Sequence, residues 1–93
     1  MEGVTKGFVI RGRVQGVGFR WWTRQTADAL GVVGTVRNLP DGTVRVIARA
    51  DEEAMLQFAD KLRDGPPFSR VEAVEESAAE LADDVGAFTI EHR

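Results

Sequence analysis

The chain has 93 residues, of which 43% are hydrophobic, and its net charge is −3, which suits a single globular domain over residues 1–93. It contains no cysteine, so disulfides, thiolate metal sites and a cysteine nucleophile are excluded. No apolar run is long enough to cross a bilayer and residues 1–7 lack a signal-type stretch, so we expect a soluble, cytoplasmic protein without a membrane partner.

The first predicted elements are a strand and a helix joined by a glycine-rich loop. Residues 6–14 alternate between apolar and polar types, which predicts a half-buried strand. The loop of residues 15–18 follows, and Gly31 is placed as a helix C-terminal stop. Between them, residues at helical spacing predict a helix over 19–30: Phe19, Trp22, Thr26, Ala27 and Leu30.

A hairpin and a second helix come next. Residues 32–39 and 43–50 are rich in β-formers and are joined by Pro40, Asp41 and Gly42, which supply turn geometry. The acidic residues 51–53 favour a helix N-terminus, and Gly65 with two prolines ends that helix. Its apolar stripe consists of Met55, Phe58, Ala59 and Leu62.

The last part of the chain predicts strands over residues 71–76 and 87–91, while the pattern of 77–84 is ambiguous. The resulting order is βαββαβ with a short extra strand at the end. This order is typical of an α+β fold, the ferredoxin-like split βαβ sandwich, in which two helices cover one face of an antiparallel sheet. The fold hosts many unrelated activities and does not by itself indicate one.

The loop between the first strand and the first helix suits an anion. Successive backbone N–H groups in a glycine-rich turn can form a concave nest, and the positive end of the helix dipole adds to it. Arg20 lies in the first helical turn, where the helix dipole disfavours a cation. An arginine at this unfavourable position indicates that it has a function there. Residues 1–45 contain seven bases and three acids, a net +4, against −7 for the remainder. A plain tight turn followed by a solvated arginine is the alternative.

Two separated motifs resemble the signatures of the acylphosphatase family. The first consists of Ile10, Gly12, Val14, Gln15, Gly16, Val17, Phe19 and Arg20. The second consists of Gly34, Val36, Asn38, Gly42 and Val44. The resemblance spans nearly the whole chain and implies a hydrolase that splits carboxyl phosphate anhydrides, with an acyl phosphate as substrate and inorganic phosphate as product and competing ligand.

The same resemblance implies where the site lies. The phosphate would be held by the loop residues Gln15, Gly16, Val17, Gly18, Phe19 and Arg20. Arg20 would offset the phosphate charge and Asn38 would position the attacking water, with no metal or other cofactor. On local sequence alone, Asn38 is equally suited to be a backbone-bonding residue of the following turn. We expect a monomer.

For five further residues the sequence gives separate expectations about exposure, orientation or backbone strain. Thr35 stands where the family usually has an aromatic residue and should point away from the Asn38 face, while Ala50 replaces a usual glycine and would be strained at a positive φ. Trp22 belongs to the apolar stripe of the first helix, so Trp21 should be partly exposed, with contact to the acyl group as a weaker option. His92 is expected to be a solvated terminal residue.

Two other functions compete with this interpretation. A nucleic-acid-binding module on the same fold would need aromatic residues on its central strands and a basic sheet, but residues 43–50 contain no aromatic and the chain is acidic. The second alternative is a non-hydrolytic module that binds acyl or carbamoyl phosphate. The expectation that this 93-residue chain has no partner domain favours the hydrolase.

Overall fold

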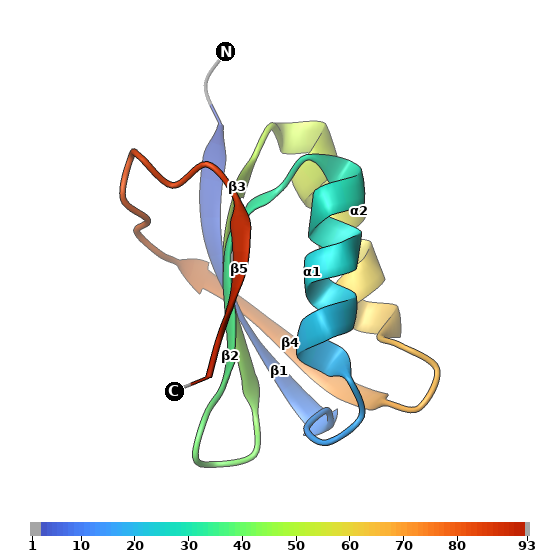
Figure 1. The fold of residues 1–93 in the computed structure, drawn as a ribbon. Coiled ribbons are helices and arrows are strands. Elements are labelled where there is room, and N and C mark those ends of the chain that lie inside the picture. Colours follow the sequence, from blue (N-terminus) through green and yellow to red (C-terminus); the bar gives the residue numbers. More distant parts are fainter. Residues whose placement is uncertain (1–2, 93) are drawn as a thin grey trace.

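Five strands and two helices follow one another along residues 3–92, which are the residues that the computed structural model describes (Figure 1). They are β1 (Val4–Arg13), α1 (Phe19–Leu30), β2 (Val33–Asn38), β3 (Val44–Ala50), α2 (Glu52–Asp64), β4 (Arg70–Ala78) and β5 (Phe88–Glu91). The predicted order is therefore confirmed. No helix in this part of the chain is long and apolar enough to cross a membrane.

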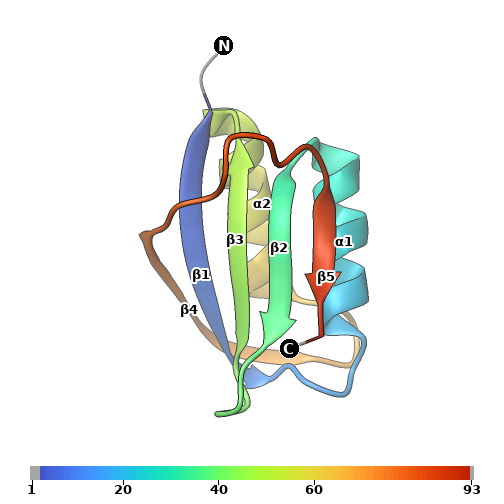
Figure 2. The ribbon, with the colours of Figure 1, turned by 60° about the vertical axis from the view of Figure 1, so that its left-hand side comes forward.

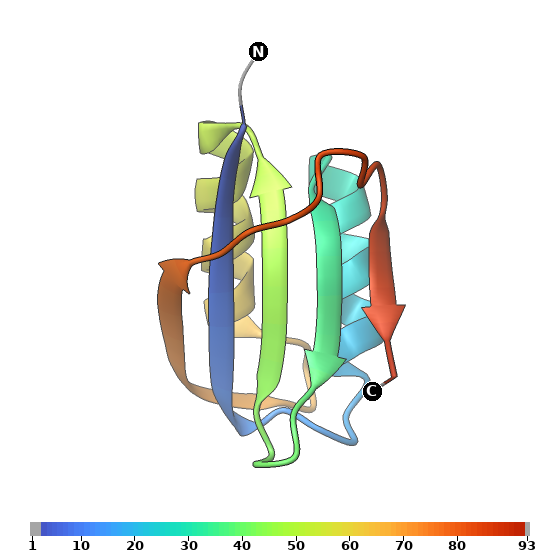
Figure 3. The same cartoon turned by 90° about the vertical axis from the view of Figure 1, so that its left-hand side faces the viewer.

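The strands form one sheet in the order β4-β1-β3-β2-β5, so that β4 and β5 are its two edges (Figures 2 and 3). The first four strands pair in an antiparallel manner, as the ferredoxin-like prediction requires. β5 instead pairs in parallel with β2, so the complete sheet is mixed. The pairing is parallel because the chain crosses back to the far end of the sheet before β5 begins (Figure 3).

Helix α1 begins and ends at glycines in the left-handed region. Gly18 is its N-cap, with φ 79° and no side-chain capping bond, and Gly31 is its C-cap with φ 74°. The buried residues are Phe19, Thr23 and Ala27, so the face against the sheet includes a threonine that the predicted stripe omitted. Its hydroxyl donates to the carbonyl oxygen of Phe19 at 2.8 Å, which satisfies the buried polar group.

Helix α2 is capped by a side chain. Asp51 has an extended backbone and accepts a hydrogen bond from the Ala54 N–H at 2.8 Å, while Glu52 and Glu53 occupy the first turn. The carboxylate satisfies one of the free N–H donors at the helix start, and the acidic turn suits the positive end of the dipole.

Replacing Asp51 with alanine is expected to lower the free energy of unfolding by about 1 kcal/mol, because the first turn of α2 loses this acceptor. Urea unfolding at neutral pH measures the change. Asp51→Asn, which keeps an oxygen acceptor at the same position, is the control and should remain close to the wild type. Equal loss in the two variants would show that charge at the helix dipole, not the capping bond, stabilises this end.

The core lies between the helices and the sheet. Three aromatic rings meet edge to face there: Phe58 of α2 contacts Phe8 of β1 and Phe88 of β5, each with a centroid distance of 6.1 Å. All three rings are buried. Each edge-to-face pair contributes about 1 kcal/mol beyond the burial of its apolar area. The three rings thus connect the inner strand β1, the edge strand β5 and helix α2.

The ambiguous segment is resolved as the end of β4 followed by a strap, residues 79–87, that crosses the open face of the sheet (Figure 3). Arg49 of β3 holds the strap, because its Nη2 donates to the carbonyl oxygens of Leu81 and Ala82 at 2.6 and 3.2 Å. This crossing brings the chain to the position from which β5 pairs in parallel with β2.

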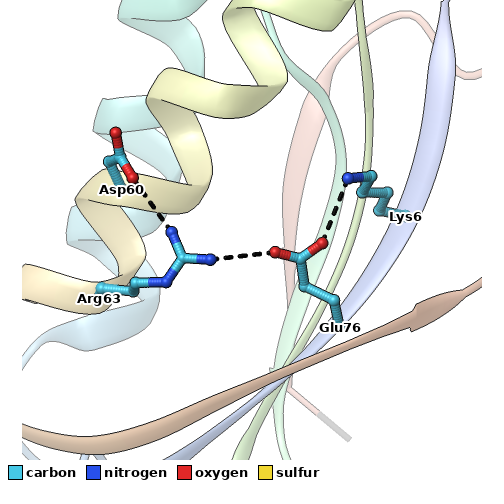
Figure 4. A network of polar contacts seen from close by, with 4 residues as sticks. All are labelled: Lys6, Asp60, Arg63 and Glu76. Atoms are coloured by element: carbon cyan, nitrogen blue, oxygen red, sulfur yellow. Dashed lines mark hydrogen bonds and ion pairs between the residues drawn. The ribbon is translucent and has the colours of Figure 1, made fainter.

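An ion-pair network joins β1, β4 and α2 (Figure 4). Glu76 of β4 accepts from Lys6 at 3.2 Å and from Arg63 at 3.1 Å, and Arg63 also contacts Asp60. These side chains are 35–80% exposed, so each pair stabilises the fold by at most about 1 kcal/mol. The network therefore joins α2 to β1 and β4 but adds little to the stability of the fold.

The two departures from the family pattern lie in ordinary backbone. Among the described residues only glycines have positive φ, so the backbone of Ala50 is not strained by a left-handed conformation. Thr35 is paired with Ile47 of β3, and its odd position in β2 places it on the face opposite to that of Val36 and Asn38.

Candidate active site

The loop before α1 presents free backbone donors. Gly16 and Gly18 have φ 76° and 79°, a conformation that residues with a Cβ rarely adopt. Across the part of the chain that the structure describes, no N–H of residues 15–21 donates to a backbone carbonyl, and the first such bond of α1 comes from Trp22. Together with the positive end of the α1 dipole, these N–H groups can bind an anion.

Arg20 reaches from α1 to the end of β5. Its Nη1 donates to the carbonyl oxygen of Glu91 at 3.3 Å and lies 3.3 Å from Nδ1 of His92. Within residues 3–92, its Nε and Nη2 make no hydrogen bond. Because Nε and Nη2 form one edge of the guanidinium, that edge is available for two parallel bonds to a phosphate. The contact with β5 therefore orients the guanidinium and leaves this edge free among the described residues.

Asn38 is the last residue of β2, and its side chain plays no part in the turn that follows. Asp41 Oδ1 accepts from the N–H and the hydroxyl of Thr43, at 3.0 and 2.6 Å, and the Leu39 N–H bonds to the Thr43 carbonyl. These bonds from Thr43 lower the pKa of Asp41. Since the turn is stabilised without Asn38, the alternative of a turn residue has no supporting bond among the described residues.

Gln15 connects the loop to this hairpin. Its Nε2 donates to the carbonyl oxygens of Leu39 and Thr43, at 2.9 and 2.8 Å. The bonds hold the glycine-rich loop beside the strand end that contains Asn38. Gln15 thus has a positioning contact that the sequence did not predict.

A cavity of about 210 Å³ lies where these elements meet. Of the predicted site residues it is lined by Gly16, Gly18, Phe19, Arg20 and Asn38, whereas Gln15 and Val17 are not among its lining residues. The lining also includes Val14, Trp21, Ile90 and His92. The structure therefore brings the two predicted catalytic residues into one cavity.

Val14, Ile90 and His92 line the cavity although the sequence did not predict them as site residues. His92 is exposed, as expected for a residue near the end of the chain, but its contact with Arg20 was missed. The alternation around Phe88 predicted β5 itself, yet no local signal indicated that β5 pairs with β2. Without that pairing, the neighbourhood of Arg20 could not be inferred.

The chemistry available in the cavity is that of anion binding. The Arg20 guanidinium and the backbone N–H groups of the glycine-rich loop surround the cavity, and the carboxamide of Asn38 also lines it. Among residues 3–92, no three His, Cys, Asp or Glu side chains are grouped as metal ligands would be. A wider groove of about 500 Å³ between α1 and α2 has Lys61 and Asp64 at its rim but no glycine nest, and it is less suited to phosphate.

Comparison with known proteins gives a consistent result. The acylphosphatase family matches residues 6–90. An acylphosphatase of Nitrobacter hamburgensis is 47% identical over 82% of this chain and 77% of its own length, and one of Mannheimia succiniciproducens is 41% identical over 94% and 97%. The crystal structure of acylphosphatase from Bacillus subtilis superposes with a TM-score of 0.88, at 32% identity over 94% of this chain and 97% of that one.

Proposed function

We propose that the cavity between Arg20 and Asn38 is the active site of this chain, which belongs to the acylphosphatase family. The enzyme hydrolyses carboxyl phosphate anhydrides to a carboxylate and inorganic phosphate. The observation that supports this assignment is that both residues, together with Gly16 and Gly18, line the same cavity.

In this proposal the phosphate is bound by the loop and by Arg20. The N–H groups of the loop and the first turn of α1 donate to its oxygens, and the free Nε and Nη2 edge of Arg20 adds two more bonds. The phosphoryl group already bears negative charge, which repels an incoming nucleophile. Fixed donors that offset this charge in a partly shielded site lower the barrier to attack.

Asn38 would place the attacking water. A carboxamide has no pKa in the useful range and cannot act as a general base, but its oxygen can accept a hydrogen bond from water and fix the line of attack. The water oxygen forms a bond to phosphorus while the bond to the carboxylate oxygen breaks. The proton that water releases passes to a phosphate oxygen of the substrate.

The leaving group needs no acid from the protein. A carboxylate departs without being protonated because it is a weak base whose conjugate acid is already ionised at neutral pH. Positioning and charge stabilisation are therefore sufficient. This explains how a site with neither a cysteine nor a cluster of acids can support the reaction. The proposal includes no metal ion, and it describes residues 1–93 as one monomeric, cytoplasmic domain without a nucleic-acid or membrane partner.

The alternative of a non-hydrolytic module for acyl or carbamoyl phosphate is not favoured. The matched relatives are acylphosphatases, and the alignments cover 77% and 97% of their own lengths in the two examples above.

Release of inorganic phosphate from benzoyl phosphate, with and without a chelator, tests the proposal. We expect turnover that is unchanged after dialysis against EDTA, because charge stabilisation comes from Arg20 and backbone N–H groups. Loss of turnover in EDTA that Mg²⁺ restores would contradict the metal-free mechanism. Tight binding of benzoyl phosphate without phosphate release would instead favour the non-hydrolytic module.

A further inference from the structure

The cavity has one large apolar side chain that is open to solvent. Among its apolar lining residues, Val14 and Phe19 are 1% and 2% exposed and belong to the core, whereas Trp21 is 62% exposed. Ile90 is half-buried on β5. An indole in this position offers a flat apolar surface to whatever extends out of the phosphate site.

Packing of α1 does not explain Trp21. The neighbouring Trp22 contacts Phe19 in an edge-to-face manner, at a centroid distance of 5.4 Å, and packs against the core. Residues adjacent in a helix point in different directions, so Trp21 cannot share this contact. A large exposed aromatic beside a binding cavity is typical of a ligand-contacting residue.

The geometry of the reaction places the acyl group on the side of Trp21, an argument that depends on the function proposed above. Attack in line with the leaving group puts water and the acyl carboxylate on opposite sides of phosphorus. Asn38 lies at the end of β2, in the sheet layer, whereas Trp21 lies on α1, in the helix layer. A leaving group directed away from Asn38 is therefore directed towards the helix layer.

We propose that Trp21 is the specificity-determining residue for the acyl group and that the enzyme prefers acyl phosphates with an aromatic or bulky apolar acyl group. The indole stacks on that group in the bound substrate and remains there during attack. Small acyl groups such as acetyl do not reach the indole and gain nothing from it. Trp21 makes no contact with the phosphate in this arrangement, so its contribution is to binding and not to the chemical step.

Steady-state kinetics of Trp21→Ala with benzoyl phosphate and acetyl phosphate test this proposal. For benzoyl phosphate we expect KM to rise roughly 3- to 10-fold with kcat nearly unchanged, because stacking of this kind stabilises ground and transition states alike. Both constants for acetyl phosphate should stay at the wild-type values. Trp21→Phe, which keeps a ring, should retain most of the preference.

Leu56→Ala is the matched control, since Leu56 is 63% exposed on α2 and does not line the cavity. It should leave both substrates unaffected. An unchanged ratio of kcat/KM for the two substrates in Trp21→Ala would overturn the proposal, whether both values stay at the wild-type level or both fall by the same factor. If Asn38→Ala kept full turnover, the assignment of the water side would fail. That result is distinguishable from failure of this proposal because it does not involve Trp21.

Discussion

Replacing Arg20 with alanine is expected to reduce kcat/KM for an acyl phosphate by on the order of 10²- to 10³-fold, which corresponds to roughly 3–4 kcal/mol. The guanidinium meets the anion in both the ground state and the transition state, so the affinity for inorganic phosphate should fall as well. NMR titration with phosphate measures that affinity, and in the wild type the largest amide shifts should come from residues 15–20.

Arg24→Ala is the matched control for Arg20, because Arg24 lies one turn further along α1, is exposed and does not line the cavity. Its phosphate affinity and turnover should equal those of the wild type. Arg20→Lys should recover only part of the loss, since an ammonium group cannot make two parallel bonds to phosphate. Unchanged phosphate affinity in Arg20→Ala would remove Arg20 from the phosphate site.

Replacing Asn38 with alanine is expected to lower kcat by at least a similar factor, on the order of 10²-fold or more, and to leave the affinity for inorganic phosphate nearly unchanged. The carboxamide acts on the water during attack, and it is not a donor to the bound phosphate in the proposed mechanism. The comparison of kcat with phosphate affinity therefore separates the role of Asn38 from that of Arg20.

The fold should tolerate this substitution, because the turn after β2 is held by Asp41, Thr43 and backbone bonds. The urea midpoint of Asn38→Ala checks this, and Gln57→Ala, which removes an exposed carboxamide from α2, is the activity control. Full turnover in Asn38→Ala would restore the interpretation of Asn38 as a turn residue. A loss of phosphate affinity as large as that of Arg20→Ala would contradict the division of roles.

The parts of the site that the sequence predicted depend on short-range patterns. Gly18 and Gly31 mark the ends of α1, and the residues between the two hairpin strands specify a turn, so both elements follow from neighbours along the chain. Arg20 could be singled out because helix electrostatics disfavour a cation in the first turn. These local signals indicated the loop and the helix start, whereas the place of Asn38 in the site was implied by the resemblance to the acylphosphatase family and not by its local sequence.

The parts that could not be predicted depend on contacts between distant residues. Arg20 and Glu91 are 71 positions apart, and their contact requires the parallel pairing of β5 with β2. Neither the hydrophobic periodicity of the sequence nor a turn motif specifies this pairing. The same holds for Gln15, whose partners Leu39 and Thr43 lie 24 and 28 positions away. A polar side chain that donates to distant carbonyls has no signature in the sequence.

The order of the strands has a consequence for how this protein avoids self-association. The outer edges of β4 and β5 present unpaired N–H and C=O groups, which could recruit a strand from another molecule. β5 is only four residues long, and β4 contains the exposed Glu72, Glu75 and Glu76. Glu75 and Glu76 are held in ion pairs, so this edge presents charged side chains, and not an apolar strand, to an approaching chain. The shortness of one edge strand and the charged side chains of the other disfavour edge-to-edge aggregation of the sheet.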